Sequence, residues 1–201
     1  MGGTSLLPAS MHDTEPRLQN AAHSRDGMTA VRAVALVGFM GAGKTTAGRE
    51  LARQLSWAFE DLDDRIEAQE SRSVEQIFQE SGEAGFRAAE HMALQQLFSE
   101  VKAEPRVVAL GGGAFVQANN AALLESSGIP IVFLDASPDE LFRRCKEQGT
   151  NRPLRRDRTE FLKLYETRQP HYRKAGFQID TTGKDVQTVA AEIARLLGLT
   201  A

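Results

Sequence analysis

The chain has 201 residues, enough for one domain with a sizeable buried core. Its formal net charge of −3 argues against a protein that mainly coats nucleic acid or an anionic membrane. Its one cysteine, Cys145, excludes an internal disulfide, and no apolar run approaches the roughly 18 residues needed to span a bilayer. We therefore expect a cytoplasmic protein.

The first 30 residues differ in composition from the rest of the chain. They mix Gly, Ser, Pro, Asn, His and scattered charges without apolar periodicity. Such a segment cannot bury enough apolar surface to offset the entropy lost on ordering. We expect a disordered N-terminal tail over residues 1–30 and a single domain over residues 31–201.

An apolar run from Ala33 to Val37 leads directly into residues 38–45, GFMGAGKT, which fit the phosphate-loop pattern G-x-x-x-x-G-K-[ST]. Backbone N–H groups in such a loop bind phosphate, and the following helix points the positive end of its dipole at the same place. In this pattern Lys44 reaches the β- and γ-phosphates and Thr45 holds Mg²⁺. A dinucleotide fingerprint overlaps the loop, but its third glycine would fall at Thr46, so we reject that interpretation.

The rest of the chain alternates short apolar runs with amphipathic ones. Strands are predicted at 33–37, 107–110 and 131–134, with weaker candidates at 58–60 and 177–180. Four-residue apolar spacing predicts helices around 47–55, 83–102 and 189–197. We predict a three-layer α/β/α P-loop kinase fold with a parallel sheet of about five strands. Ligands then bind at the carboxyl ends of the strands.

Acidic residues follow the second predicted strand. If the chain is still extended there, Asp61 and Asp63 point to one side. One carboxylate would hold Mg²⁺ or its waters, and the other would accept a proton from a substrate hydroxyl. The alternative is a helix N-terminus, where acidic residues favour the dipole, and we prefer this alternative for Asp64.

The predicted helix at 83–102 carries Arg87 at the edge of its apolar stripe, and three glycines, Gly111, Gly112 and Gly113, follow the third strand. Taken alone, Arg87 is typical of a solvated surface. The glycines, taken alone, are typical of a flexible turn. Beside a phosphate loop, however, the triplet lets the backbone approach a substrate closely.

A basic stretch follows at residues 143–158, with seven cationic and two acidic residues. We predict a loop here and, over about 146–158, a mobile lid that closes on ATP and places an arginine on the transferring phosphoryl group. A nucleic-acid-binding patch is the alternative. Beyond it, residues 165–172 form a helical stretch interrupted by Pro170, in which Arg168 could clamp a carboxylate.

The order of these motifs resembles the shikimate kinase family. It runs G-x-M-G-A-G-K-T, D-x-D, G-E-x-G-F-R, G-G-G, R-P-L and E-x-R-x-P-x-Y, and the resemblance spans about Val31 to Leu197. The resemblance implies transfer of the γ-phosphate of ATP to the 3-hydroxyl of shikimate, on the route to aromatic amino acids. It implies one Mg²⁺ per site, with ATP as co-substrate.

The resemblance also implies a role for each matching residue. Asp61 falls where the family places a carboxylate near Mg²⁺, and Asp63 where a residue binds the shikimate hydroxyls and is the proposed base. Arg87 and Arg168 match the two arginines that hold the shikimate carboxylate. The implied catalytic residues are Lys44, Asp63 and Arg152; the ATP-binding residues are Gly41, Ala42, Gly43, Lys44, Thr45, Thr46, Arg144 and Arg152; the substrate-binding residues are Asp63, Arg87, Gly111, Gly112, Gly113 and Arg168; the metal-binding residues are Thr45 and Asp61.

Three features depart from the family pattern. Leu110 stands where many relatives carry a small hydroxyl residue, Arg155 replaces a leucine after R-P-L, and the spacing from Arg144 to Arg152 is about one residue longer than usual. The last departure leaves the adenine contact at Arg144 open.

Other functions remain open alternatives. A gluconate-type or nucleotide kinase would share the fold, but two arginines, an aspartate and glycines suit a small hydroxylated carboxylic acid better than a second base. A nucleotide-dependent switch would need a guanine-reading motif such as N-K-x-D, which the sequence lacks. A nucleic-acid-binding ATPase would use the basic stretch. We expect a monomer that binds ATP and shikimate, without nucleic-acid or membrane partners.

Overall fold

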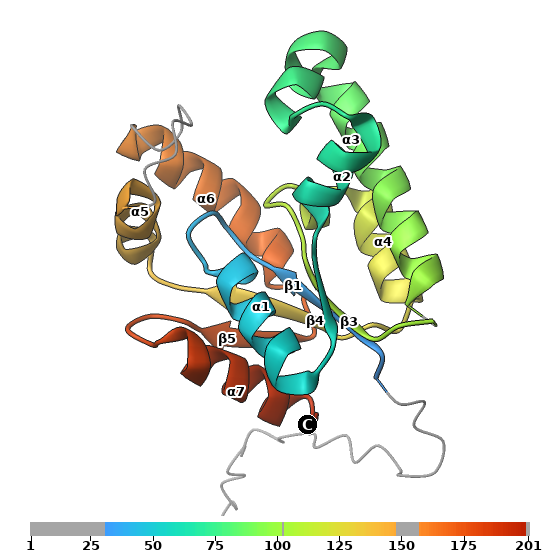
Figure 1. Cartoon of the computed structure of the whole chain (residues 1–201). Helices are drawn as coiled ribbons and strands as arrows, with labels where there is room; N and C mark the ends of the chain where they lie inside the picture. Colours follow the sequence, from blue (N-terminus) through green and yellow to red (C-terminus); the bar gives the residue numbers. More distant parts are fainter. Residues whose placement is uncertain (1–30, 102, 148–156, 200–201) are drawn as a thin grey trace, which may run out of the picture. The chain divides into compact units, whose positions relative to one another are not determined.

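The computed structural model describes residues 31–101, 103–147 and 157–199. The chain builds one parallel sheet of five strands in the order β2-β3-β1-β4-β5, with helices on both sides (Figure 1). The predicted tail over residues 1–30 lies outside the described residues. The elements are β1 (Ala33–Val37), α1 (Lys44–Leu55), β2 (Ala58–Asp61), α2 (Leu62–Glu70), α3 (Val74–Glu100), β3 (Arg106–Ala109), the 3-10 turn η1 (Ala114–Val116), α4 (Ala118–Ser126), β4 (Ile131–Asp135), α5 (Pro138–Glu147), α6 (Arg158–Tyr172), β5 (Phe177–Asp180) and α7 (Val186–Leu196).

The position of each strand explains its sequence. β1 lies at the centre, where Leu36 is aligned with Ala109 of β3 and Val132 of β4, and all five of its residues are buried. A strand covered on both faces reads as a continuous apolar run. The two weaker candidates, β2 and β5, are the edge strands, and their residues are only partly buried. The predicted sheet is confirmed.

The helices form a layer on each side of the sheet. α1 and α7 pack against each other in front of it, and α4 and α6 lie behind it (Figure 1). The apolar positions that predicted the helices are buried, including Ala47 and Leu51 of α1 and Ile193 of α7. The predicted three layers are therefore confirmed. Among the described residues, no helix is long and apolar enough to cross a membrane.

Two local predictions were wrong. Residues 143–147 were predicted as part of a loop but complete α5, since Leu141, Phe142 and Cys145 bury one face of that helix. Pro170 does not interrupt α6, which continues to Tyr172. Proline lacks only one N–H group, and the last turn is still closed by the hydrogen bond from Arg173 N to Gln169 O at 3.0 Å.

The long α3 has an internal break at Gly82, whose φ of 68° and ψ of −176° are not helical. The part after Gly82 is the predicted helix. The part before it was not predicted, although Ser73 and Gln76 form a reciprocal capping box at its start. The break lets one continuous segment change direction, and it places Arg87 five residues into the second part.

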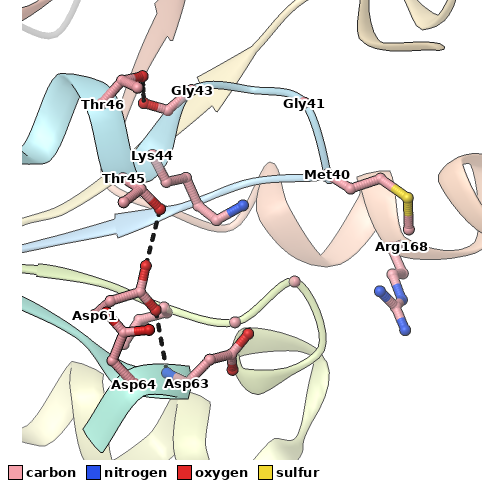
Figure 2. Close-up of a pocket in the computed structure, with 13 residues that line it drawn as sticks. Met40, Gly41, Gly43, Lys44, Thr45, Thr46, Asp61, Asp63, Asp64 and Arg168 are labelled. Atoms are coloured by element: carbon pink, nitrogen blue, oxygen red, sulfur yellow. Dashed lines mark hydrogen bonds between the residues drawn. The ribbon is translucent and has the colours of Figure 1, made fainter. Parts of the chain in front are cut away.

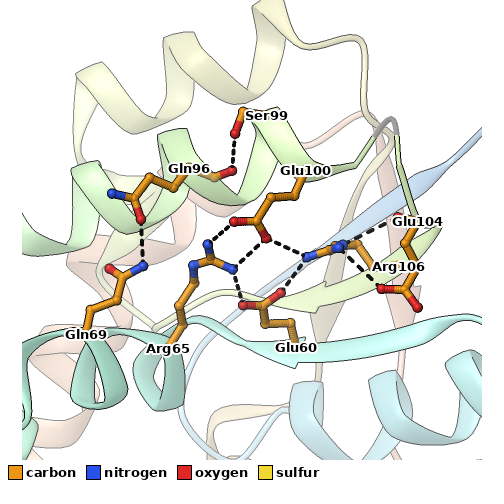
Figure 3. Close-up of polar contacts among 8 residues, drawn as sticks. All are labelled: Glu60, Arg65, Gln69, Gln96, Ser99, Glu100, Glu104 and Arg106. Atoms are coloured by element: carbon orange, nitrogen blue, oxygen red, sulfur yellow. Dashed lines mark hydrogen bonds and ion pairs between the residues drawn. The ribbon is translucent and has the colours of Figure 1, made fainter.

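An ion-pair network connects the edge of the sheet to α2 and α3 (Figure 3). Arg65 of α2 bonds Glu60 of β2 at 2.5 Å and Glu100 of α3 at 2.6 Å. Arg106 of β3 bonds the same two carboxylates at 2.9 and 3.2 Å. Because Arg106 is only 7% exposed, its charge depends on these partners in place of water.

Replacing Arg106 with methionine is expected to lower the free energy of unfolding by about 2 kcal/mol, since it leaves two close carboxylates with one arginine between them. Urea titration followed by circular dichroism measures the change. Arg53→Met is the matched control, because Arg53 is an exposed side chain that pairs with Glu50 of its own helix, and its loss should cost much less. Equal losses for the two variants would contradict the network's role.

Candidate active site

The loop between β1 and α1 has the backbone that phosphate binding requires. Gly41 and Gly43 have φ of 81° and 87°, in the left-handed region that favours glycine. A Cβ at Gly41 would also lie 2.6 Å from the carbonyl oxygen of Leu141. Gly43 is the N-cap of α1 and provides no side-chain cap, and the first turn holds no acidic residue. The N–H groups at this helix start therefore suit an anion.

A cavity of about 350 Å³ opens at the carboxyl ends of β1, β2 and β3 (Figure 2). It brings together most of the predicted site residues, along with three that were not assigned a role, namely Met40, Asp64 and Leu110. Figure 2 shows Lys44 and Thr45 on one side, the aspartates below them and Arg168 entering from α6. The lining residues are Met40, Gly41, Gly43, Lys44, Thr45, Thr46, Asp61, Asp63, Asp64, Leu110, Gly111, Gly112 and Arg168.

Lys44 projects into this cavity from the start of α1. Its Nζ donates hydrogen bonds to the carbonyl oxygens of Gly38 at 2.9 Å and Phe39 at 3.1 Å. Burial lowers the pKa of Lys44 to about 8, against the opposing pull of the Asp63 and Asp61 carboxylates. Because burial disfavours the charged form of Lys44, a phosphate bound next to it would stabilise the ammonium.

The lowered pKa of Lys44 predicts proton uptake when Mg-ATP binds. Lys44 in the free protein loses its proton as the pH rises through about 8, and the phosphates favour its charged form, so binding should take up a proton fraction that is larger at pH 8.5 than at pH 6.5. ATP affinity should accordingly fall as the pH rises above 8. Calorimetry in buffers of different ionisation enthalpy measures the uptake. An unchanged uptake in Lys44→Met would contradict the assignment to Lys44.

Asp61 is hydrogen-bonded to both Thr45 and Asp63. Thr45 Oγ1 donates to Asp61 Oδ2 at 2.8 Å, and Asp61 Oδ1 accepts from the backbone N–H of Asp63 at 3.1 Å. The premise that the chain is extended through Asp63 was wrong, because β2 ends at Asp61 and α2 begins at Leu62. Asp61 caps the helix that presents Asp63, and both carboxylates still line the cavity.

Thr45 and Asp61 fit Mg²⁺ bound jointly by protein and nucleotide. A hydroxyl and a carboxylate beside a phosphate loop are the hard oxygen donors this ion prefers, and Mg²⁺ usually keeps several waters and substrate phosphates as ligands. Among the described residues, no cluster of three or more His, Cys, Asp or Glu side chains could hold a metal by itself. Thr45 and Asp61 are the residues that could hold the ion, with waters and phosphate oxygens as its other ligands.

Each glycine of the triplet lies against a different predicted substrate residue. A Cβ at Gly111 would lie 2.6 Å from Asp63 Oδ1, and one at Gly113 would lie 2.6 Å from Arg87 Nη2. A Cβ at Gly112 would lie 3.4 Å from Arg168 Nη1. The triplet is therefore a surface that lies close to one carboxylate and two guanidinium groups.

A buried polar network lies behind Arg87. Arg87 Nη1 donates to both carboxylate oxygens of Glu90, at 3.1 and 3.0 Å, and Glu90 is 0% exposed. Burial raises the pKa of Glu90, and the guanidinium of Arg87 opposes that rise. Asn120 donates to Glu90 at 3.4 Å and contacts His91 Nδ1 at 2.7 Å through its own Oδ1. Arg87 is thus fixed within the fold and is not a freely solvated side chain.

A second cavity, of about 420 Å³, lies on the other side of the phosphate loop and is partly lined by Gly41, Ala42 and Thr46. Arg144 of α5 borders it and donates to Thr181 at Oγ1 and at the carbonyl oxygen, at 3.0 and 2.7 Å. The residues after β5, including Thr181 and Gly183, had not been assigned a function. They follow a strand at its carboxyl end, so the same rule that selected the residues after β2 and β3 could have found them.

Arg152 and most of the predicted lid lie outside the described residues. Lys146 and Glu147 belong to α5, and Arg158 is the first residue of α6, where it bonds Asp139 of α5 at 2.5 Å. The assigned roles of Arg152 in ATP binding and catalysis stay predictions.

Comparisons with known proteins identify the family. The family model described as shikimate kinase matches residues 40–197. The chain is 40% identical to a shikimate kinase of Geobacter metallireducens over 172 residues, which cover 84% of this chain and 93% of the relative. The chain belongs to the shikimate kinase family. A shikimate kinase of Bordetella pertussis is 39% identical over 201 residues, covering 94% of this chain and 93% of the relative.

A solved structure carries the same family name. A shikimate kinase from Acinetobacter baumannii in complex with shikimate matches with a TM-score of 0.75 and 35% identity, covering 84% of this chain and 93% of that one. The predicted family and fold class are confirmed, and this member of the shikimate kinase family is a phosphotransferase.

Proposed function

We propose that the protein transfers the γ-phosphoryl group of ATP to the 3-hydroxyl of shikimate. The observation that carries the proposal is the glycine triplet, which packs against Asp63, Arg168 and Arg87 at the edge of the cavity that also holds Lys44. A carboxylate and two guanidinium groups suit a small acid with hydroxyl groups. Family membership supports the same reaction.

On the ATP side, the phosphate loop binds the triphosphate through its N–H groups, and the ammonium of Lys44 moves from the Gly38 and Phe39 carbonyl oxygens to the phosphates. Thr45 and Asp61 would hold one Mg²⁺ together with phosphate oxygens, and the ion would supply positive charge that neutralises the transferring group. The cavity beside Arg144 and Thr181 takes the adenine. Arg152, which lies outside the described residues, is assigned to the phosphates on the family resemblance alone.

On the acceptor side, Arg87 and Arg168 bind the shikimate carboxylate, and the glycine triplet lines the ring. Asp63 accepts a hydrogen bond from the 3-hydroxyl and takes its proton as the oxygen attacks the γ-phosphorus. The N-cap bond from Asp61 fixes the helix turn that presents Asp63.

ADP release tests the proposal directly. The protein is incubated with Mg-ATP and, separately, shikimate, gluconate or a nucleoside monophosphate, and ADP is followed by a coupled assay. Of these acceptors, only shikimate is expected to stimulate the release of ADP. Release that depends on gluconate or a nucleotide, and not on shikimate, would overturn the choice of acceptor. We also propose that the enzyme acts as a monomer, which sedimentation equilibrium would test.

Gly113→Ala is expected to raise the KM for shikimate about tenfold and to leave the KM for ATP unchanged. The new methyl group would displace the Arg87 guanidinium, which the two bonds to Glu90 hold in place. The backbone itself tolerates alanine, since φ at Gly113 is −104°. Gly176→Ala is the matched control, because no atom lies within 4 Å of a Cβ there. An equal rise in both variants, or a rise in the KM for ATP, would contradict the placement of Arg87.

A further inference from the structure

The hydroxyl of Tyr172 lies where α6 meets the glycine triplet. Tyr172 is the last residue of α6 and is 0% exposed, with its ring 5.4 Å from the ring of Phe133. The hydroxyl donates a hydrogen bond to the carbonyl oxygen of Gly112. Arg168 lies next to this hydroxyl, since its Nη1 and the Tyr172 oxygen are both within 4 Å of the position that a Cβ would take at Gly112. One oxygen atom is therefore bonded to the middle of the substrate loop and lies close to a substrate arginine.

The geometry of α6 explains why the two side chains meet. Arg168 and Tyr172 are four residues apart, so they share one face of the helix. That face meets Gly112, where a Cβ would lie 3.4 Å from Arg168 Nη1 and 3.7 Å from the Tyr172 oxygen. Both groups therefore lie at van der Waals distance from the same point of the loop.

The Tyr172 hydroxyl acts as a hydrogen-bond donor toward the loop. A phenol has one proton to donate, and here it goes to a backbone carbonyl, so the oxygen can only accept from the guanidinium. Burial raises the pKa of Tyr172 to about 12, so the hydroxyl keeps that proton across the physiological range. The hydrogen bond from Tyr172 to Gly112 thus keeps one orientation, in which the acceptor side of the oxygen is left for the neighbouring guanidinium.

We propose that Tyr172 is a positioning residue for the acceptor substrate, holding the Arg168 guanidinium and the glycine triplet in register through its hydroxyl. Because Gly111 and Gly113 contact Asp63 and Arg87, fixing Gly112 also fixes the surface against which those side chains lie. This inference rests on the proposed function. The competing explanation is that Tyr172 serves only as core, through its ring.

Tyr172→Phe separates these explanations, since it keeps the ring and removes the hydroxyl. The KM for shikimate is expected to rise about tenfold, because the bond that holds Gly112 in place beside the Arg168 guanidinium is lost. The kcat should stay within about twofold and the KM for ATP should not change, because the carboxylate contact is made equally before and during transfer. A core role through the ring alone would leave the KM for shikimate as in the wild type.

The chain offers a matched control on the same helix. Tyr165 is also buried, but its hydroxyl bonds Asp135 at 3.3 Å and Gln169 at 2.8 Å, and it does not line the first cavity. Tyr165→Phe should leave the KM for shikimate unchanged. An equal rise in both variants, or no rise in Tyr172→Phe, would overturn the proposal.

A measurement without substrate distinguishes this proposal from the proposed function. In ¹⁵N-labelled, ligand-free protein, the side-chain N–H resonance of Arg168, assigned by its loss in Arg168→Lys, should shift or broaden in Tyr172→Phe and stay in place in Tyr165→Phe. An unmoved resonance in Tyr172→Phe would overturn the positioning role whatever the enzyme phosphorylates. A wild-type protein that releases no ADP with shikimate would instead overturn the proposed function.

Discussion

Lys44→Met is expected to lower kcat by at least about 10³-fold while the protein stays folded. The ammonium stabilises charge that develops on the transferring phosphoryl group, and the loss of one such group in a preorganised site typically costs two to three orders of magnitude. Here Lys44 is a cationic side chain of the phosphate loop itself, which favours the upper end of that range. Single-turnover measurement of shikimate phosphorylation checks the value.

The stability of Lys44→Met provides an internal check. Burial lowers the pKa of Lys44, so the folded protein disfavours the charged form at neutral pH. Removing the charge should therefore leave the melting temperature unchanged or raise it. Lys163→Met, at an exposed position of α6, serves as the control and should retain full activity. A Lys44→Met protein that retains a tenth or more of the wild-type kcat would contradict the assigned role.

Asp63→Asn is the second large effect and is expected to lower kcat by about 10²- to 10⁴-fold, the usual contribution of a general base. The amide keeps the size of the carboxylate, so the contact with Gly111 is retained and the KM for Mg-ATP should change little. Steady-state kinetics in both substrates separates the two effects.

Asp64→Asn is the matched control for Asp63→Asn. Asp64 occupies the same first turn of α2 and also lines the cavity, but it is exposed. We assign Asp64 a favourable interaction with the dipole of α2, so its replacement should change kcat by less than about threefold. If Asp64→Asn were the more damaging variant, the proton would have to be accepted at Asp64.

The fold could be predicted largely from the sequence because the central strands are buried on both faces. A strand such as β1 has to be apolar throughout, and such a continuous apolar run can be recognised in a single sequence. α2 and α5 were harder to predict. α2 is short, and its sequence around Asp63 and Asp64 also fits an extended chain, whereas the basic residues that end α5 occupy its exposed face and mask the buried one formed by Leu141 and Cys145.

The phosphate-binding residues could be predicted from the sequence because a phosphate loop is contiguous. The acceptor-binding residues could not be predicted from the pattern alone, since Arg87 and Arg168 are more than 80 residues apart and each is typical of a surface residue on its own. Family resemblance supplied their roles. The contacts of each glycine with a separate side chain, and the junction at Tyr172, arise from tertiary packing of α6 on the sheet and have no local signature.

Identification of the product is the most direct test of the central claim. Shikimate is incubated with the enzyme, Mg²⁺ and ATP labelled with ¹⁸O in the γ-phosphoryl group, and the product is analysed by mass spectrometry and ³¹P NMR. We predict one phosphoryl group on the 3-hydroxyl of shikimate, with the label retained and one ADP formed per product. ATP hydrolysis to free phosphate at the same rate with and without shikimate, and no phosphorylated shikimate, would contradict the account.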